Sequence, residues 1–293
     1  MKKKNMILQV CLIAIFTILC ALIIFPFILL VSASLSSAAD LSTKGYQIIP
    51  NPVDFSAYQF ILQSPDTIIR AYLVTFIFSI VSMVFAVAFM SMIAYPLART
   101  KLKGKGFINF FLYFTMLFGG GLVPTYLLLA GTLHLDNTIW IYILPALINP
   151  WHVFMIRTFF KGIPEEIIES ATIDGASEYT IFVRMILPLS KPVLATIALF
   201  TFLGKWNDWN TALIYITNDK LYSLQYLLQS MMKELEIIQQ MEQQGMSTAG
   251  IGELSAKTVR MAMAVVVAGP ALLVFPFFQK YFVKGLTVGS VKG

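Results

Sequence analysis

Six long apolar stretches, separated by polar segments, dominate the pattern of hydrophobic and polar positions along the chain. Each has the length, about 20 residues, that an α-helix needs to cross a hydrocarbon core about 30 Å thick. We therefore expect an all-α, polytopic membrane protein that forms a single transmembrane domain over residues 1–293. The six expected spans lie near residues 7–32, 70–96, 107–131, 138–160, 191–216 and 258–280.

The first apolar stretch follows Lys2, Lys3 and Lys4, so a cleaved signal peptide is an alternative to a membrane span. The polar sequence SASLSSAAD after it would offer a cleavage region. The apolar run is, however, longer than the roughly 7–15 apolar residues of a signal peptide. This length favours an uncleaved first span.

The distribution of basic residues predicts the orientation in the membrane. With the N-terminus inside, 14 of the 21 Lys and Arg residues fall in cytoplasmic segments, and six fall at or near the outer ends. The remaining one, Lys205, lies within a span. Because cytoplasmic loops carry the excess of Lys and Arg, both termini and residues 161–190 are expected inside, and residues 217–257 outside.

Composition excludes several classes of protein. A mean hydropathy of +0.77 is outside the range of soluble domains. No stretch matches the G-x-x-x-x-G-K-[ST] pattern whose backbone amides bind phosphates, so this chain alone is not expected to hydrolyse ATP. Neither a metal-ligand cluster around His134 or His152 nor a basic nucleic-acid patch is apparent. Cys11 and Cys20 lie roughly 13 Å apart on one expected helix, too far for a disulfide.

One charged segment contrasts with the rest of the chain. EEIIESATIDGASEYTIFVRMILPLSKP, residues 165–192, carries seven charged side chains. Pro164 with Glu165 and Glu166 predicts a helix start, because proline suits a first turn and acids there complement the helix dipole. Asp174-Gly175 predicts a turn, and a second helix is expected up to Pro188.

A helix–turn–helix of this kind has two interpretations. It could be an amphipathic connector that rests on the bilayer surface. The charges of its first helix are all acidic, however, which is a poor match for an anionic cytoplasmic leaflet that attracts Lys and Arg. Acidic residues on a short exposed helix favour a docking surface for another protein.

The same segment resembles the EAA loop of bacterial ABC-importer permeases, in which Glu-Ala-Ala is followed after three residues by glycine and then by an apolar stretch ending in Leu-Pro. Here Ser170 replaces the first alanine, a small residue for a small one. Three stretches are similar to the carbohydrate branch of that family, in the subunit related to the smaller maltose-importer permease: FFKGIPEEIIESATIDGAS, WNDW at 206–209 and KGLTVGSVKG at the C-terminus. FGGGLVPTY at 118–126 resembles the oligosaccharide subgroup of that branch.

The resemblance implies a type I ABC-importer permease fold and a coupling helix that docks on a separate ATPase subunit. It implies a second homologous permease, two ATPase subunits that bind ATP and magnesium, an extracytoplasmic binding protein and an oligosaccharide substrate, all at a bacterial cell membrane. No cofactor is implied for this chain. The residues that would form the ATPase-coupling element are Glu169, Ser170, Ala171, Asp174, Gly175, Ala176, Phe182, Leu187 and Pro188.

A polar run, GKWNDWN, lies within the fifth apolar stretch. A charge at the bilayer centre costs about 2.5–3.5 kcal/mol, so Lys205 and Asp208 are expected to face protein, each other or a water-filled cavity. Alternatively the run lies at the outer interface, where Trp is favoured. The candidate substrate-pathway or interface residues are Lys205, Trp206, Asn207, Asp208, Trp209 and Asn210.

Two interpretations of this run stay open. Its indole and amide groups have the chemistry that binds sugars, and Lys205 could pair with an acidic sugar. The same residues could serve helix packing, with Lys205 paired to Asp208 instead. The sequence does not identify the transported sugar. The hypothesis is that it is a uronic-acid fragment of a plant or algal polysaccharide.

The expected outer segment contains a helical pattern, LYSLQYLLQSMMKELEIIQQMEQQ. By position it corresponds to the loop that contacts the binding protein in the family, and the alternative is a surface helix without a partner. The C-terminal GLTVGSVKG resembles a tail that enters the ATPase interface, and the alternative is a frayed end. The candidate binding-protein contacts are Tyr222, Gln225, Gln229 and Lys233.

Two other classes compete with a transport subunit of this kind. An ion-coupled secondary transporter would need charged groups inside several spans, and only the Lys205–Asp208 region qualifies. A membrane-embedded enzyme would need a catalytic group of residues at one depth, and none is visible in the sequence.

Overall fold

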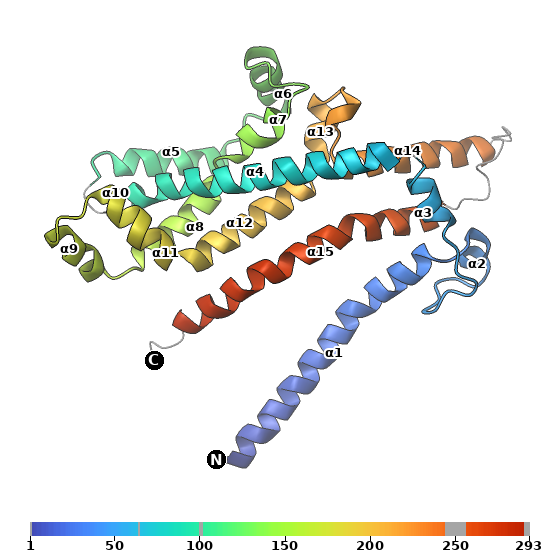
Figure 1. Cartoon of the computed structure of the whole chain (residues 1–293), viewed down its shortest axis with the longest axis horizontal. Coiled ribbons are helices and arrows are strands. Elements are labelled where there is room, and N and C mark those ends of the chain that lie inside the picture. Colours follow the sequence, from blue (N-terminus) through green and yellow to red (C-terminus); the bar gives the residue numbers. More distant parts are fainter. Residues whose placement is uncertain (1, 64, 100–101, 244–255, 290–293) are drawn as a thin grey trace. The chain divides into compact units, whose positions relative to one another are not determined.

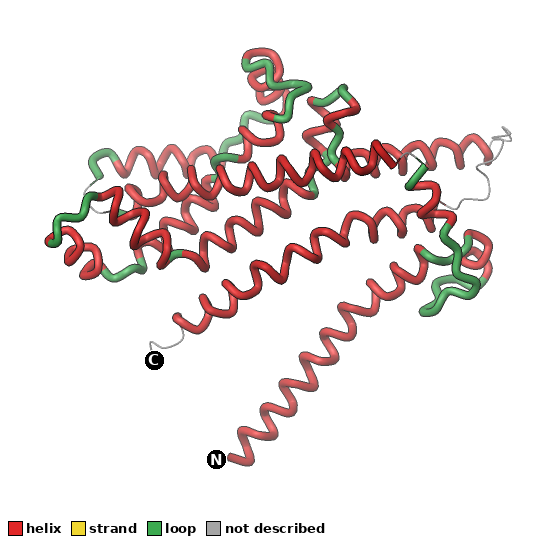
Figure 2. The backbone as a smooth tube through the Cα atoms, in the orientation of Figure 1, coloured by secondary structure: helices red, strands yellow, loops and turns green. Residues whose placement is uncertain are grey.

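The computed structural model describes residues 2–63, 65–99, 102–243 and 256–289, and within these ranges it contains helices and loops but no strand (Figure 2). The described residues form two compact units. Unit 1 comprises residues 1–68 and 228–270, and unit 2 comprises residues 69–227 and 271–293. The all-helical prediction is confirmed for the described residues, and the single domain over 1–293 stays a prediction.

Unit 1 contains the N-terminal helix, the short helices that follow it, and most of residues 217–257, the segment expected outside the membrane (Figure 1). Its polar contacts are local: Asp54 N–H donates to the Leu35 carbonyl at 2.8 Å, and the Ser34 and Tyr58 hydroxyls lie 2.8 Å apart. Its helices are α1 (Lys2–Ser34), α2 (Ala38–Thr43), α3 (Ser56–Ile61), most of α14 (Leu224–Gln243) and the first part of α15 (Ala256–Gly289).

Unit 2 holds the long helix α4, Pro65–Ala98, from residue 69 onward, together with most of the shorter helices. The others form a series from residue 105 to residue 221. They are α5 (Lys105–Leu117), α6 (Leu122–Tyr126), η1 (Leu127–Thr132), α7 (Trp140–Ile143), η2 (Leu144–Ala146), α8 (Pro150–Lys161), α9 (Glu165–Ile173), α10 (Glu178–Ile181), η3 (Phe182–Ile186), α11 (Leu187–Leu189), α12 (Lys191–Trp206), α13 (Asn210–Tyr215) and η4 (Asp219–Leu221).

Two groups of buried side chains hold unit 2 together. One joins α4, α8, the 165–189 segment and α12, with Met90, Ile156 and Ile197 fully buried. The other joins α4, α7 and α13, where the Phe78 and Tyr142 rings stack 4.2 Å apart. Full burial of such a side chain contributes about 1.5–3 kcal/mol.

Three helices in the described part of the chain are long and apolar enough to cross a membrane: Leu8–Ser34, Pro65–Ala98 and Lys257–Gln279. They fall where the first, second and sixth spans are expected. Two pairs of bent helices raise the number of candidate spans to five if each pair counts as one. Six spans therefore stay a prediction.

The stretch expected as the third span is not one continuous helix. Residues 105–117 and 122–132 form two helical arms that meet at 116°. Three consecutive glycines, 119–121, separate the arms, and Gly121 adopts φ +82°, a left-handed conformation that glycine tolerates best. Hydropathy indicates how apolar such a stretch is, but the bend at Gly119–Gly121, hereafter the glycine elbow, determines the direction of the chain after it.

The fourth and fifth stretches are also divided. Between residues 138 and 160 the helical path breaks before Pro150, with Asn149 capping α8 through its side chain. Between 191 and 216, α12 ends at Trp206 and α13 begins at Asn210. The polar run at 204–210 therefore ends a helix instead of lying in its middle, and its depth in a membrane stays a prediction.

Candidate functional site

The charged segment folds as a helical hairpin, hereafter the charged hairpin: α9, the turn at residues 174–177, and the helical segment α10–η3–α11 up to Leu189. The predicted helix start and turn are confirmed. Glu165 and Glu166 occupy the first turn of α9. Asp174 ends the helix and Gly175 follows at φ +80°. Figure 1 shows α9 at one end of unit 2, beyond the end of α4.

The turn is closed by backbone and side-chain hydrogen bonds. The Ala176 N–H donates to the Ala171 carbonyl at 2.9 Å, and the Gly175 N–H donates to the Thr172 carbonyl at 3.1 Å. Ser177 then caps α10, because its hydroxyl accepts from the Thr180 N–H at 3.2 Å. These bonds satisfy the helix ends that a sharp reversal would otherwise leave unpaired.

Burial separates the predicted coupling residues into two sets. Ala171 is buried, and Ala176, Phe182 and Leu187 are partly buried and pack on the core of unit 2. These small and apolar residues anchor the hairpin from within. The predicted coupling residues left exposed are Glu169, Ser170, Asp174, Gly175 and Pro188.

Two apolar side chains on this hairpin were missed by the sequence reasoning. Ile173 is 85% exposed at the last position of α9, and Tyr179 is 75% exposed just beyond the turn. Their only signal in the sequence is that they flank the Asp-Gly turn. Large apolar groups at the tip of a charged hairpin are typical of a protein contact surface.

The carboxylate of Glu178, the first residue of α10, links the hairpin to α4. The Tyr95 hydroxyl donates to one of its oxygens, and the Arg99 guanidinium donates to the other at 3.2 Å. The Tyr95 ring also lies 5.0 Å from the Phe182 ring. Residues about 80 positions apart in the chain therefore meet at the base of the hairpin.

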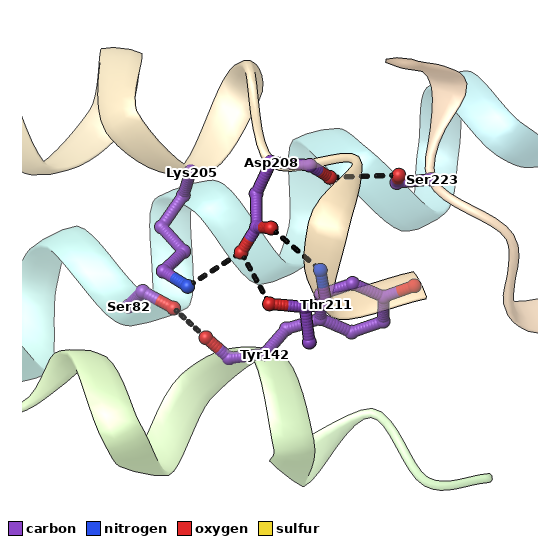
Figure 3. Close-up of polar contacts among 6 residues, drawn as sticks. All are labelled: Ser82, Tyr142, Lys205, Asp208, Thr211 and Ser223. Atoms are coloured by element: carbon purple, nitrogen blue, oxygen red, sulfur yellow. Dashed lines mark hydrogen bonds and ion pairs between the residues drawn. The ribbon is translucent and has the colours of Figure 1, made fainter. Parts of the chain in front are cut away.

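The polar cluster, Lys205, Asp208, Thr211 and Ser223, lies at the break between α12 and α13 (Figure 3). Lys205 and Asp208 form an ion pair at 2.8 Å, with side chains 18% and 12% exposed. The Asp208 carboxylate also accepts from the Thr211 N–H at 3.0 Å and the Thr211 hydroxyl at 2.8 Å. The Ser223 hydroxyl donates to the Asp208 backbone carbonyl at 2.8 Å.

The aspartate therefore acts as a cap for α13 and as the counter-ion of Lys205. Between the two alternatives left open by the sequence, this geometry favours helix packing over a free lysine that would receive an acidic sugar. Trp206 takes a packing position as well: it is 1% exposed and lies against the Phe202 and Tyr72 rings, so it does not face a solute path in this structure. Trp209 and Asn210 are exposed.

Asn207 joins the break to the start of α14. Its side-chain amide donates to the Leu203 carbonyl at 2.9 Å, and its oxygen accepts from Gln225 at 2.9 Å. Among the other predicted binding-protein contacts, Tyr222 and Gln229 are partly exposed and Lys233 is exposed. Burial raises the pKa of the Tyr222 hydroxyl.

A second link near this region centres on Asn137, which sits in a left-handed backbone conformation at φ +52°. Its side-chain oxygen accepts from the Thr217 N–H, the Thr217 hydroxyl and the Asn218 N–H at 2.7–3.0 Å. The segment before α7 and the segment after α13 are thereby tied together.

Apolar helices of membrane-spanning length, broken apolar helices and one exposed, charged hairpin are the features of a multi-pass membrane protein with a docking surface. The family model described as "Binding-protein-dependent transport system inner membrane component" matches residues 68–288. The chain belongs to this family and is a permease subunit of an ABC importer. As such it works with a further permease, an ATPase and a solute-binding protein.

Curated relatives cover almost the whole chain. Protein LplC of Bacillus subtilis is 38% identical over 273 residues, covering 93% of this chain and 90% of the relative. The polygalacturonan/rhamnogalacturonan transport system permease protein YtcP of the same organism is 37% identical over 279 residues, covering 95% and 94%. The chain is thus similar in length and sequence to permeases of carbohydrate importers.

A solved structure shares the fold. It is a bacterial ABC transporter involved in the import of the acidic polysaccharide alginate, matched with a TM-score of 0.77 at 27% identity, over 95% of this chain and 98% of that one. The ion-coupled alternative based on Lys205 and Asp208 is not retained, because the family is that of ABC-importer permeases and the two side chains neutralise each other.

Proposed function

We propose that this permease forms half of the translocation pathway of a bacterial cell-membrane importer, in a heterodimer with a second homologous permease. Two ATPase subunits bind ATP and magnesium, and a binding protein delivers the solute from outside. The chain has six spans, with both termini and residues 161–190 in the cytoplasm and residues 217–257 outside. The basic residues that predict this orientation support it.

The charged hairpin is the docking element for the ATPase in this proposal. The observation that carries it is the combination of an anchored base and an exposed tip. Ile168 and Ala171 are buried against unit 2, whereas Ile173 is 85% exposed beside the acidic groups Glu169 and Asp174. A rigidly anchored surface with an apolar centre and a charged rim is the anatomy of a protein interface.

The proposed solute is an oligosaccharide that carries carboxylates. Support comes from two relatives, one described as a polygalacturonan/rhamnogalacturonan permease and one from an importer of the acidic polysaccharide alginate. Within this chain, the exposed Trp209 and Asn210 are the remaining candidates for solute contact from the predicted set. Lys205 is assigned to its ion pair with Asp208 instead.

The experiment that tests the docking role is copurification of the tagged permease from its native membranes in mild detergent, comparing wild type with Gly175→Arg. Gly175 is at φ +80° with open space around it, so the substitution strains the turn by about 1–2 kcal/mol and places a bulky cation at the tip. The matched control is Gly45→Arg, which has φ +71° and equally open surroundings. Gly45 lies between the first and second expected spans, in residues 33–69, which are expected outside because the N-terminus is expected inside.

We expect wild type and Gly45→Arg to retain both a P-loop ATPase and a second permease, and Gly175→Arg to lose the ATPase alone. Retention of the ATPase by Gly175→Arg would contradict the docking role. A wild-type chain that is purified alone, or only as a homo-oligomer, would contradict the proposed assembly.

A further inference from the structure

The contact between Glu178 and α4 has a geometry that a chance surface contact seldom has. Tyr95 lies in the last turn of α4, and Arg99 directly follows the last residue of that helix, Ala98. The Arg99 N–H donates to the Tyr95 carbonyl at 3.2 Å. Each of the two side chains uses a different oxygen of the same carboxylate. Glu178 thus contacts both the last turn of a long helix and the residue that follows it, and a rotation or shift of either partner alters both hydrogen bonds.

The exposure of the three side chains indicates whether the contact mainly stabilises the fold or mainly fixes the position of Glu178. Tyr95 is 9% exposed, the Arg99 side chain is 20% exposed, and the Glu178 side chain is 64% exposed. An ion pair with one largely solvated partner adds little to stability. A hydrogen bond from a buried tyrosine, by contrast, fixes the position of its acceptor, because the hydroxyl has been removed from water and needs a partner.

The position of Glu178 in the hairpin gives this contact a mechanical consequence. Glu178 directly follows the capping residue Ser177 and lies three residues after the turn glycine, Gly175. Displacement of the exposed tip therefore reaches Glu178 through a short, hydrogen-bonded turn. α4 is the apolar helix of membrane-spanning length that ends at Ala98, next to the Arg99 side chain.

An open pocket lies beside this contact. Its volume is about 540 Å³, and its lining includes Tyr95 and Arg99 together with Glu165 at the start of α9. α10, through Glu178 and Phe182, contacts Tyr95.

We propose that Glu178 is a positioning residue that transmits displacement of the charged hairpin to α4 through Tyr95 and Arg99. The inference rests on the proposed docking of an ATPase on the hairpin, and it adds the route by which that docking moves a membrane span. Glu178 is not a docking residue in this scheme: its carboxylate faces α4 and serves the step after docking.

The test compares Glu178→Ala with wild type in the complete transporter, reconstituted in lipid with its ATPase and binding protein. Ala is tolerated at an exposed helical position and removes both hydrogen bonds. The matched control is Asp40→Ala, which removes another ion-paired carboxylate, bound to Lys44 at 2.7 Å in unit 1, outside the segment assigned to the binding protein. The readouts are ATPase copurification, basal ATPase rate, and the ATPase rate stimulated by solute-loaded binding protein.

We expect Glu178→Ala to keep the ATPase and its basal rate while the stimulation falls about fivefold or more, the lower range of coupling between sites. Glu178→Gln keeps an acceptor for Tyr95, so its loss is expected to be smaller. Tyr95→Phe combined with Glu178→Ala is expected to lose no more than Glu178→Ala alone, since the two act as one unit.

Two outcomes would overturn the proposal. Unchanged stimulation in Glu178→Ala, with the ATPase still bound, overturns the positioning role and leaves the docking role intact. Loss of the ATPase itself in Glu178→Ala shows that Glu178 maintains the docking surface, and it overturns the assignment to a later step. Failure of the docking proposal is distinguished from both, because Gly175→Arg would then retain the ATPase.

Discussion

Replacement of Asp208 tests whether the polar cluster is a structural cap or a solute site. The Asp208 carboxylate is 12% exposed and makes three contacts: the ion pair with Lys205 and the two hydrogen bonds from Thr211. Asp208→Ala removes all three and leaves Lys205 without its counter-ion. Asp208→Asn keeps an oxygen that accepts from the Thr211 N–H but removes the charge.

The expected destabilisation follows from the separate contributions. Loss of a capping acceptor costs about 1 kcal/mol. Breaking a fully buried ion pair by removing one partner costs about 3–5 kcal/mol, and this is reduced here because the Lys205 side chain, 18% exposed, has some access to water. We therefore expect about 3–4 kcal/mol for Asp208→Ala and about 2 kcal/mol for Asp208→Asn.

The assay is thermal denaturation of the purified transporter in lipid nanodiscs, with Lys205→Met and Lys205→Met/Asp208→Asn as companions. In Lys205→Met/Asp208→Asn no buried charge is left without a partner, so this double variant is expected to be more stable than Asp208→Asn alone. Import of an acidic and a neutral oligosaccharide is measured for each variant. We expect both rates to fall in proportion to the amount of folded transporter.

One result would refute this reasoning. If Asp208→Ala leaves the denaturation temperature unchanged while the import of the acidic sugar changes relative to the neutral one, the cluster contacts the solute and is not a cap.

Two further predictions concern the charged hairpin. Ile173→Ser is expected to weaken ATPase binding about tenfold or more, because burial of an isoleucine contributes about 1.5–3 kcal/mol. The control is Ile237→Ser, at a 52% exposed position of α14. Equal ATPase retention by the two variants would contradict the prediction. In a Cys11→Ser/Cys20→Ser background, Tyr179→Cys is expected to react with a membrane-impermeant maleimide from the cytoplasmic side only, and Lys220→Cys from the outside only. Labelling of both from one side would contradict the orientation.

The sequence predicts the parts of this fold that depend on local chemistry. Helices α1, α4 and α15 follow from uninterrupted apolar length, and the ends of α9 follow from Glu165 and Asp174-Gly175. The paths of the broken stretches depend on what the chain does after a glycine or proline. Hydropathy carries no information about a 116° bend at 119–121, because the two arms together pass as one apolar stretch.

The candidate site divides in the same way. The EAA-like residues locate the charged hairpin, but which of them are exposed depends on packing against α4 and α8. Ala171 is buried although the pattern marks it for docking, whereas Ile173 is exposed although its type suggests a core position. The pairing of Lys205 with Asp208 was one of two open alternatives, since a three-residue spacing permits an ion pair without requiring it.

The glycine elbow at 119–121 also has a consequence for how the protein enters the membrane. Its two arms, residues 105–117 and 122–132, are each shorter than the roughly 20 residues that stabilise a helix across the bilayer. Neither arm alone has the length for stable insertion during synthesis. We therefore expect the region to reach its final path late in the biogenesis of the subunit, after neighbouring helices cover its backbone at the bend.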